Sequence, residues 1–141
     1  MKALIIEDRE VNTIVLRAML EGTHFAVADA HDGVDGLEAF AAAVYDIVFV
    51  DLRMPRLSGL DVIRVIRRFE GYRALIPIVV VTADLTAEAR DAALEVGADA
   101  VVGKPISAET LFDAIVTACV ASELRKAARA QDRQTRGALT A

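Results

Sequence analysis

The hydrophobic and polar positions of this chain alternate between two periodicities. Five short apolar runs occur at residues 3–6, 25–28, 47–50, 76–81 and 100–102, and four of them are nearly continuous. Continuous runs of this length are typical of strands that are buried on both faces of a parallel sheet. Pro77 stands near the start of its run, where a strand tolerates a missing backbone N–H.

Between these runs lie five segments whose apolar residues recur every three to four positions, as in amphipathic helices. The expected buried faces are, in chain order, Val11, Ile14, Val15 and Ala18; Leu37, Phe40, Ala41 and Val44; Leu60, Ile63, Ile66 and Phe69; Ala89, Ala92, Ala93 and Val96; and Leu111, Ile115 and Ala118. Glycines are expected as left-handed C-caps at Gly22, Gly71 and Gly97, and serines as N-caps at Ser58 and Ser107.

Strict alternation of strands and helices predicts an α/β fold with right-handed crossovers. Five strands and five helices in about 120 residues fit a doubly wound parallel sheet of the flavodoxin-like order 2-1-3-4-5, with helices on both faces. We expect one domain over residues 1–121. Residues 122–141 form a basic C-terminal tail, either helical or disordered.

Charge and composition exclude several classes of protein. The net charge is −5, and the tail contributes +3, so the remainder carries −8. An acidic body argues against direct nucleic-acid binding, which needs clustered Lys and Arg. The single cysteine, Cys119, excludes an internal disulfide. The sequence has neither an apolar run of membrane-spanning length nor a signal-peptide pattern, so we expect a cytoplasmic location.

Polar residues end four of the five apolar runs. Glu7 and Asp8 follow the first run, Asp51 the third, Thr82 the fourth, and Lys104 with Pro105 the fifth. The carboxyl ends of parallel strands share one edge of the sheet, where doubly wound folds bind their ligands. Three carboxylates, a hydroxyl and an ammonium group are therefore expected to converge there.

This set of groups suits phosphoryl transfer to an aspartate. Three neighbouring carboxylates raise one another's pKa values unless a cation intervenes, and Mg²⁺ prefers such oxygen ligands. A carboxylate can act as a nucleophile toward phosphorus. The metal and Lys104 would neutralise charge on the transferring group, and Thr82 can donate a hydrogen bond to a phosphoryl oxygen.

Four segments carry these polar residues: Glu7-Asp8, Asp51-Leu-Arg-Met-Pro-Arg-Leu-Ser-Gly59, Thr82-Ala83 and Lys104-Pro105. In order and spacing, they resemble the receiver domain of two-component response regulators. Each piece alone has a plainer explanation as a turn, cap or surface residue, but the joint pattern is specific. The resemblance covers roughly residues 2–121. The segment Glu7-Asp-Arg-Glu-Val-Asn-Thr13 is also similar to receivers fused to hybrid histidine kinases, so the chain is either a stand-alone regulator or part of such a kinase.

The resemblance implies a role for each matching residue. Asp51 is the phosphoacceptor, and Thr82 and Lys104 hold the phosphoryl group. The metal ligands are Asp8 directly, Glu7 mainly through water, Asp51, and the backbone carbonyl of Arg53. The Lys104–Pro105 bond is cis, and the structural switch involves Pro105 and Val101. The implied partners are a histidine kinase or histidine phosphotransfer protein, which supplies the phosphoryl group, and an unknown downstream protein. The resemblance implies that the domain is not an enzyme but a phosphoacceptor that assists its own phosphorylation and dephosphorylation.

Three other readings of the same residues are less well supported. Haloacid dehalogenase phosphatases use a second Asp two positions after the nucleophile, where this chain has Arg53. Flavodoxins have a hydroxyl-rich loop where this chain has the acidic Glu7-Asp8 pair. A pseudo-receiver lacks functional positions that are all filled here.

Two positions depart from the usual receiver pattern, and one helix carries a second stripe. Val101 replaces the aromatic switch residue three positions before Lys104, and Arg53 is long and charged. A stripe of Val116, Val120 and Leu124 on the fifth helix is either a partner surface, for example in a homodimer, or part of a wide face that packs on the core.

Overall fold

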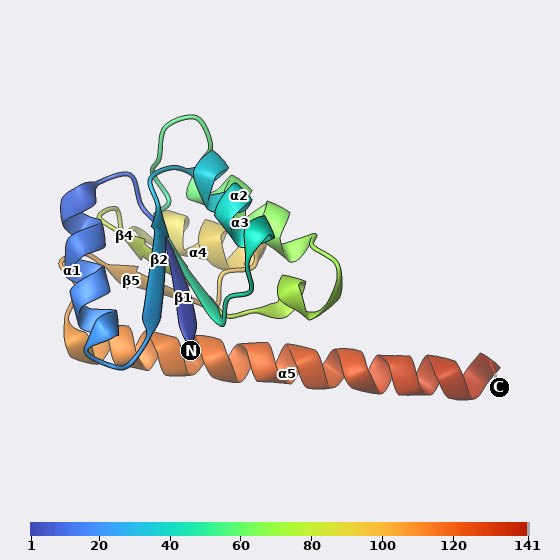
Figure 1. Cartoon of the computed structure of the whole chain (residues 1–141). Coiled ribbons are helices and arrows are strands. Elements are labelled where there is room, and N and C mark those ends of the chain that lie inside the picture. The colour runs from blue at the N-terminus through green and yellow to red at the C-terminus, as the bar shows by residue number, and fades with distance from the viewer. Residues whose placement is uncertain (141) are drawn as a thin grey trace.

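The computed structural model describes residues 1–140. In chain order, the elements are β1 (Lys2–Ile6), α1 (Glu10–Glu21), β2 (Ala26–Ala30), α2 (Gly33–Ala42), β3 (Ile47–Val50), α3 (Gly59–Arg67), the short 3₁₀ helix η1 (Gly71–Leu75), β4 (Ile78–Thr82), α4 (Ala87–Val96), β5 (Ala100–Gly103) and α5 (Ala108–Thr140). Figure 1 displays this arrangement. Within residues 1–140, no helix is both long and apolar enough to cross a membrane.

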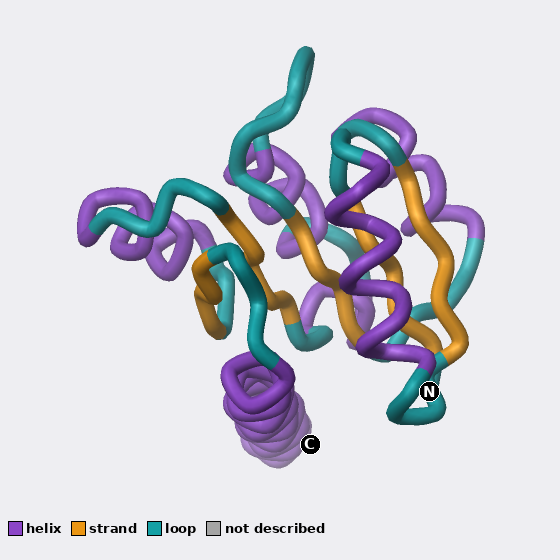
Figure 2. The backbone as a smooth tube through the Cα atoms, turned by 90° about the vertical axis from the view of Figure 1, so that its left-hand side faces the viewer, coloured by secondary structure: helices purple, strands orange, loops and turns teal. Residues whose placement is uncertain are grey.

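The strands form one parallel sheet of order β2-β1-β3-β4-β5, which confirms the predicted fold and topology. Helices cover both faces of this sheet (Figure 2). One core joins it to α2, α3 and α4 and includes Phe40, Ile63 and Ile66. The second core joins the other face to α1 and α5 and includes Leu20 and Leu111.

The predicted buried faces hold for α3, α4 and α5 but not for α1. Val11, Ile14 and Val15 are 72%, 58% and 44% exposed. The face of α1 that packs on the sheet instead carries Leu16 and Leu20, together with Thr13. This helix has two apolar stripes, and the turn after β1 determines which of them meets the sheet.

The predicted face of α2 is only partly correct. Phe40 is buried, whereas Ala41 and Val44 face solvent. The helix approaches β1 through Gly36, where an added Cβ would lie 2.7 Å from side-chain atoms of Ile6. Val44 lies beyond the end of α2 at Ala42, so the helical spacing that predicted its burial does not apply to it.

The cap predictions hold at three positions. Gly97 has a φ of 119° and ends α4, and Ser58 and Ser107 accept hydrogen bonds from the backbones of Asp61 and Thr110. Gly22 has a right-handed conformation, so its prediction as a left-handed cap is wrong. Gly71 has a positive φ but begins η1, because α3 has already ended at Arg67.

Helix α5 is longer than the other helices and continues to Thr140 (Figure 1). It crosses residue 121 without interruption, so the tail is helical through its described part. Ser122, just beyond that position, is buried, and its hydroxyl donates a 2.6 Å hydrogen bond to the carbonyl of Leu75.

Candidate functional site

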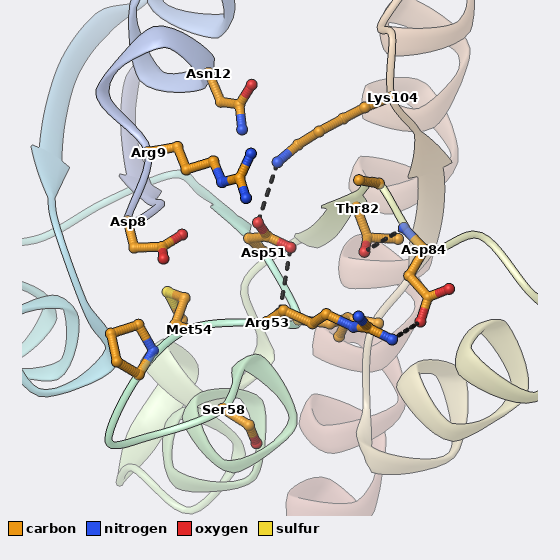
Figure 3. Close-up of a pocket in the computed structure, with 13 residues that line it drawn as sticks. Asp8, Arg9, Asn12, Asp51, Arg53, Met54, Ser58, Thr82, Asp84 and Lys104 are labelled. Carbon is orange, nitrogen blue, oxygen red and sulfur yellow. Dashed lines mark hydrogen bonds and ion pairs between the residues drawn. The ribbon is translucent and has the colours of Figure 1, made fainter.

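The carboxyl ends of β1, β3, β4 and β5 surround a cleft of about 720 Å³. The loop after β3 forms the floor of this cleft. It turns back tightly, and the N–H of Gly59 donates a hydrogen bond to the carbonyl of Leu52 across the turn. An added Cβ at Gly59 would lie only 2.2 Å from the backbone oxygen of Asp51, so this position requires glycine. The loop thereby leaves the Asp51 side chain facing the cleft, as seen in Figure 3.

Asp51 is buried directly after β3 and lies between two positively polarised groups. Lys104 Nζ donates to Asp51 Oδ2 at 3.1 Å, and the backbone N–H of Arg53 donates to Asp51 Oδ1 at 3.3 Å. These contacts hold the carboxylate in one orientation. Lys104 therefore reaches the carboxylate across the sheet edge, as the order of the strands predicts.

Lys104 is shared with a second buried carboxylate. Its Nζ also lies 3.1 Å from Glu7 Oε2, and Asn12 Nδ2 donates to Glu7 Oε1 at 2.9 Å. Burial raises the pKa of Glu7, the hydrogen bond from Asn12 opposes this rise, and the neighbouring Asp51 adds to it. The positive charge of Lys104 thus offsets only part of the negative charge in this part of the cleft.

Asp8 completes an acidic cluster with Glu7 and Asp51. One carboxylate oxygen from each residue lies within 4.8 Å of the others, and Asp8 is exposed while its two neighbours are buried. Oxygen ligands at this spacing, open to water on one side, fit a divalent cation such as Mg²⁺, which retains several waters. The donor set therefore fits the metal that the sequence predicted.

Thr82 and Arg53 lie on the other side of the cleft (Figure 3). Thr82 ends β4, is buried, and accepts a 3.2 Å hydrogen bond at its Oγ1 from the backbone N–H of Asp84. Arg53 Nη2 donates to Asp84 Oδ2 at 2.5 Å. The loops after β3 and β4 are therefore joined by an ion pair beside the phosphoacceptor candidate.

Of the two residues expected to act in a switch, Val101 lies on β5 and Pro105 follows the end of that strand by two residues. The Lys104–Pro105 bond is cis, as the resemblance implied. Val101 pairs with Val80 of β4 in the sheet and is partly buried against the core below α4. Val101 is therefore part of the sheet and not of a loop.

Sequence reasoning missed three residues at this site. Arg9, Asn12 and Asp84 all line the cleft. Asn12 follows Asp8 by one helical turn, so its position could have been inferred from the predicted start of α1. Arg9 and Asp84 lie in loops whose conformation the apolar pattern does not specify.

The comparison with family models agrees with this geometry. Residues 3–116 match the model of the response regulator receiver domain. The chain belongs to this family. Receiver domains are in general signalling modules rather than enzymes, and they interact with histidine kinases or phosphotransfer proteins.

Several curated relatives of this receiver are much longer proteins. It is 36% identical over 124 residues to the sensory/regulatory protein RpfC of Xanthomonas campestris, covering 86% of this chain and 17% of that protein. It is 34% identical over 116 residues to the autoinducer 2 sensor kinase/phosphatase LuxQ of Vibrio harveyi, covering 82% of this chain and 13% of LuxQ. The receiver therefore spans less than a fifth of these two relatives.

Solved receiver structures have the same fold. A receiver domain protein from Clostridium thermocellum superposes with a TM-score of 0.77 at 27% identity, covering 87% of this chain and 97% of that one. The receiver domain of a sensor histidine kinase from Pseudomonas aeruginosa superposes with a TM-score of 0.72 at 29% identity, covering 79% and 91%, respectively. The latter structure has a magnesium ion coordinated in its active-site cleft.

Proposed function

We propose that this receiver accepts a phosphoryl group on Asp51 from a phosphohistidine of a histidine kinase or phosphotransfer protein. The observation that carries the proposal is the buried Asp51 carboxylate, held by Lys104 and grouped with Glu7 and Asp8 at one edge of the sheet. Phosphorylation would then shift the balance between two arrangements of a partner-binding surface.

In the proposed reaction, an Asp51 carboxylate oxygen attacks phosphorus while the P–N bond of the phosphohistidine breaks. The bonding electrons leave with the imidazole, and Asp51 becomes an acyl phosphate. Lys104 stays beside Asp51 and stabilises the additional negative charge. The Thr82 hydroxyl, at the end of the adjacent strand, would donate to a phosphoryl oxygen.

Mg²⁺ would be held by Asp8, by Asp51, by the backbone carbonyl of Arg53 and, through a water molecule, by Glu7. When bound, the metal would neutralise charge on the phosphoryl oxygens. The support for this assignment is the spacing of the three carboxylates and their exposure on the Asp8 side.

The first test is the intact mass of the protein after incubation with a small phosphodonor and Mg²⁺. One phosphoryl group should be added, should be lost at alkaline pH, and should be absent from Asp51→Asn. Labelling that persists in Asp51→Asn would overturn the assignment. Asp8→Ala should stay folded and lose the Mg²⁺-dependent labelling, because it removes a metal ligand and no core side chain.

The exposed face of α1 supports a docking site for the phosphodonor protein. Val11, Ile14 and Val15 are exposed on a helix whose first turn contributes Asn12 to the cleft. A protein that brings its phosphohistidine to Asp51 must cover the rim of this cleft. Apolar side chains at that rim would be buried by such a partner.

Self-association through α5 stays a prediction. Val116, Val120 and Leu124 are 46%, 54% and 67% exposed, so they are not part of a wide face that packs on the core. Sedimentation with and without a stable phosphoryl mimic tests the homodimer. A monomer under both conditions would contradict it.

A further inference from the structure

A cluster of charged residues lies at the amino ends of β4 and β5, away from the strand ends that form the cleft. Asp99 directly precedes β5, and only 5% of its side chain is exposed. Its Oδ2 accepts a 2.9 Å hydrogen bond from the N–H of Ile78, the first residue of β4. Arg67 of α3 and Arg125 of α5 contact the same oxygen at 3.1 and 3.0 Å. Asp99 thus joins two strands to two helices.

The two arginines also bind backbone carbonyls around η1. Arg67 donates to the carbonyls of Ala74 and Ile76 and, with two nitrogens, to that of Gly97. Burial lowers the pKa of Arg67 to about 10, so the side chain remains charged near neutral pH. Arg125 donates to the carbonyls of Leu75 and Ile76 at 3.0 and 3.2 Å. The cluster therefore supplies hydrogen-bond donors to carbonyl groups of η1, Ile76 and Gly97.

Two further arginines extend these contacts along α5. Arg125, Arg129 and Arg133 follow one another at intervals of four residues and therefore lie on one face of the helix. Arg129 Nη1 donates to the carbonyl of Gly71 at 2.7 Å. The guanidinium of Arg133 lies 5.9 Å from the centre of the Tyr72 ring. Three successive turns of α5 thus contact η1.

This part of α5 has little apolar contact of its own. Leu124 is 67% exposed and Leu139 is 82% exposed. In proteins, most of the stability of a helix comes from an apolar face packed on the rest of the molecule. Arginine contacts with η1 take the place of that packing, because charge-assisted hydrogen bonds to carbonyls are stronger than neutral ones.

We propose that residues 122–133 form an arginine clamp, made of Ser122, Arg125, Arg129 and Arg133, that fixes α5 on η1. The clamp makes the C-terminal half of α5 a rigid arm that extends away from the sheet at a fixed orientation (Figure 1). The folded unit then extends about three turns beyond residue 121. This rigid arm is a property of the folded chain that does not depend on the proposed phosphorylation of Asp51.

Amide hydrogen exchange of the full chain tests the clamp. In the wild type, the amides of residues 126–136 should exchange at least about tenfold more slowly than in the double variant Arg125→Ala/Arg129→Ala. Amides of β1 and β3 should exchange at the same rate in both proteins, which shows that the core remains folded. Arg64→Ala is the matched control, because Arg64 lies on α3, pairs with Asp61 of the same helix and does not belong to α5.

A distance measurement separates a frayed helix from a helix that swivels. Spin labels at Thr135 and at Glu38 on α2, in a Cys119→Ser background, should give a narrow distance distribution in the wild type and a broad one in the double variant. Slow exchange and a narrow distribution that persist in the double variant would overturn the clamp. Fast exchange of residues 126–136 in the wild type would overturn it as well.

Discussion

The guanidinium of Arg53 and the carboxylate of Asp84 meet at 2.5 Å and join the two loops that flank Asp51. The backbone N–H of Arg53 is bound to Asp51, and that of Asp84 is bound to the Thr82 hydroxyl. The pair therefore connects the loop of the proposed phosphoacceptor to the loop of the proposed phosphoryl-binding hydroxyl. Both side chains line the cleft, where we expect them to hinder the approach of water to a phosphoryl group on Asp51.

We expect Arg53→Ala and Asp84→Ala each to shorten the lifetime of the Asp51 phosphoryl group. An exposed ion pair contributes about 1 kcal/mol or less, which corresponds to at most roughly a fivefold change in rate. The loss of the phosphoryl mass after removal of the phosphodonor measures this lifetime. If the two variants change the lifetime in opposite directions, the effect belongs to the individual side chains and not to the pair.

Glu7→Gln should make the metal-free protein more stable near neutral pH. Burial raises the pKa of Glu7, so the folded state binds the Glu7 proton more tightly than the unfolded state does. Ionised Glu7 therefore destabilises the fold above that raised pKa, and this cost disappears as the pH falls through it. The midpoint of urea unfolding in EDTA should be higher for Glu7→Gln at pH 7.5, and the difference should narrow toward pH 5. A difference that is constant with pH would show that ionisation of Glu7 is not its cause.

Ile14→Asp should impair phosphoryl transfer from a phosphohistidine protein but not from a small phosphodonor. Ile14 is 58% exposed, so the new charge leaves the core intact but would be buried by a partner on α1. We expect transfer from the protein donor to fall by about tenfold or more, the usual effect of disrupting an interface centre. Val44→Asp is the control, because Val44 is 75% exposed just after α2. Equal slowing by both variants would argue against docking on α1.

The phosphorylation-dependent change should be centred on the loop after Thr82 and the start of α4. Val101 is β-branched and packed in the sheet against the core, so it has few rotamers and little reach. The neighbouring loop is more open, and Leu85 is 50% exposed. Amide exchange with and without a stable phosphoryl mimic should therefore change at residues 82–90 and only slightly around Val101. A change confined to residues 99–103 would contradict this expectation.

The parts of the fold that the sequence predicts well are those with one apolar pattern. In α3, the stripe containing Leu60, Ile63 and Ile66 has no competitor, and the helix buries it as expected. In α1, two stripes are present, and the buried one contains Leu16 and Leu20. Periodicity alone does not distinguish them, because the phase of the helix depends on the loop that joins it to β1.

The same distinction applies to the site. Asp51, Thr82 and Lys104 lie at or directly after strand ends, and the order of the strands brings them to one edge. The contact of Arg53 with Asp84 instead depends on two loop conformations and on the direction of a long side chain. Such contacts are set by tertiary structure, so the sequence indicates the residues but not their pairing.

Gly59 limits how this chain can diverge. A side chain there would collide with the backbone of Asp51 and Leu52, at 2.2 and 2.8 Å, although Gly59 offers no group that binds a metal or phosphate. Selection for signalling should therefore remove substitutions at Gly59 as strictly as those at Asp51. Among descendants of this sequence, an invariant glycine at this position would record a steric requirement of the backbone and no chemical role.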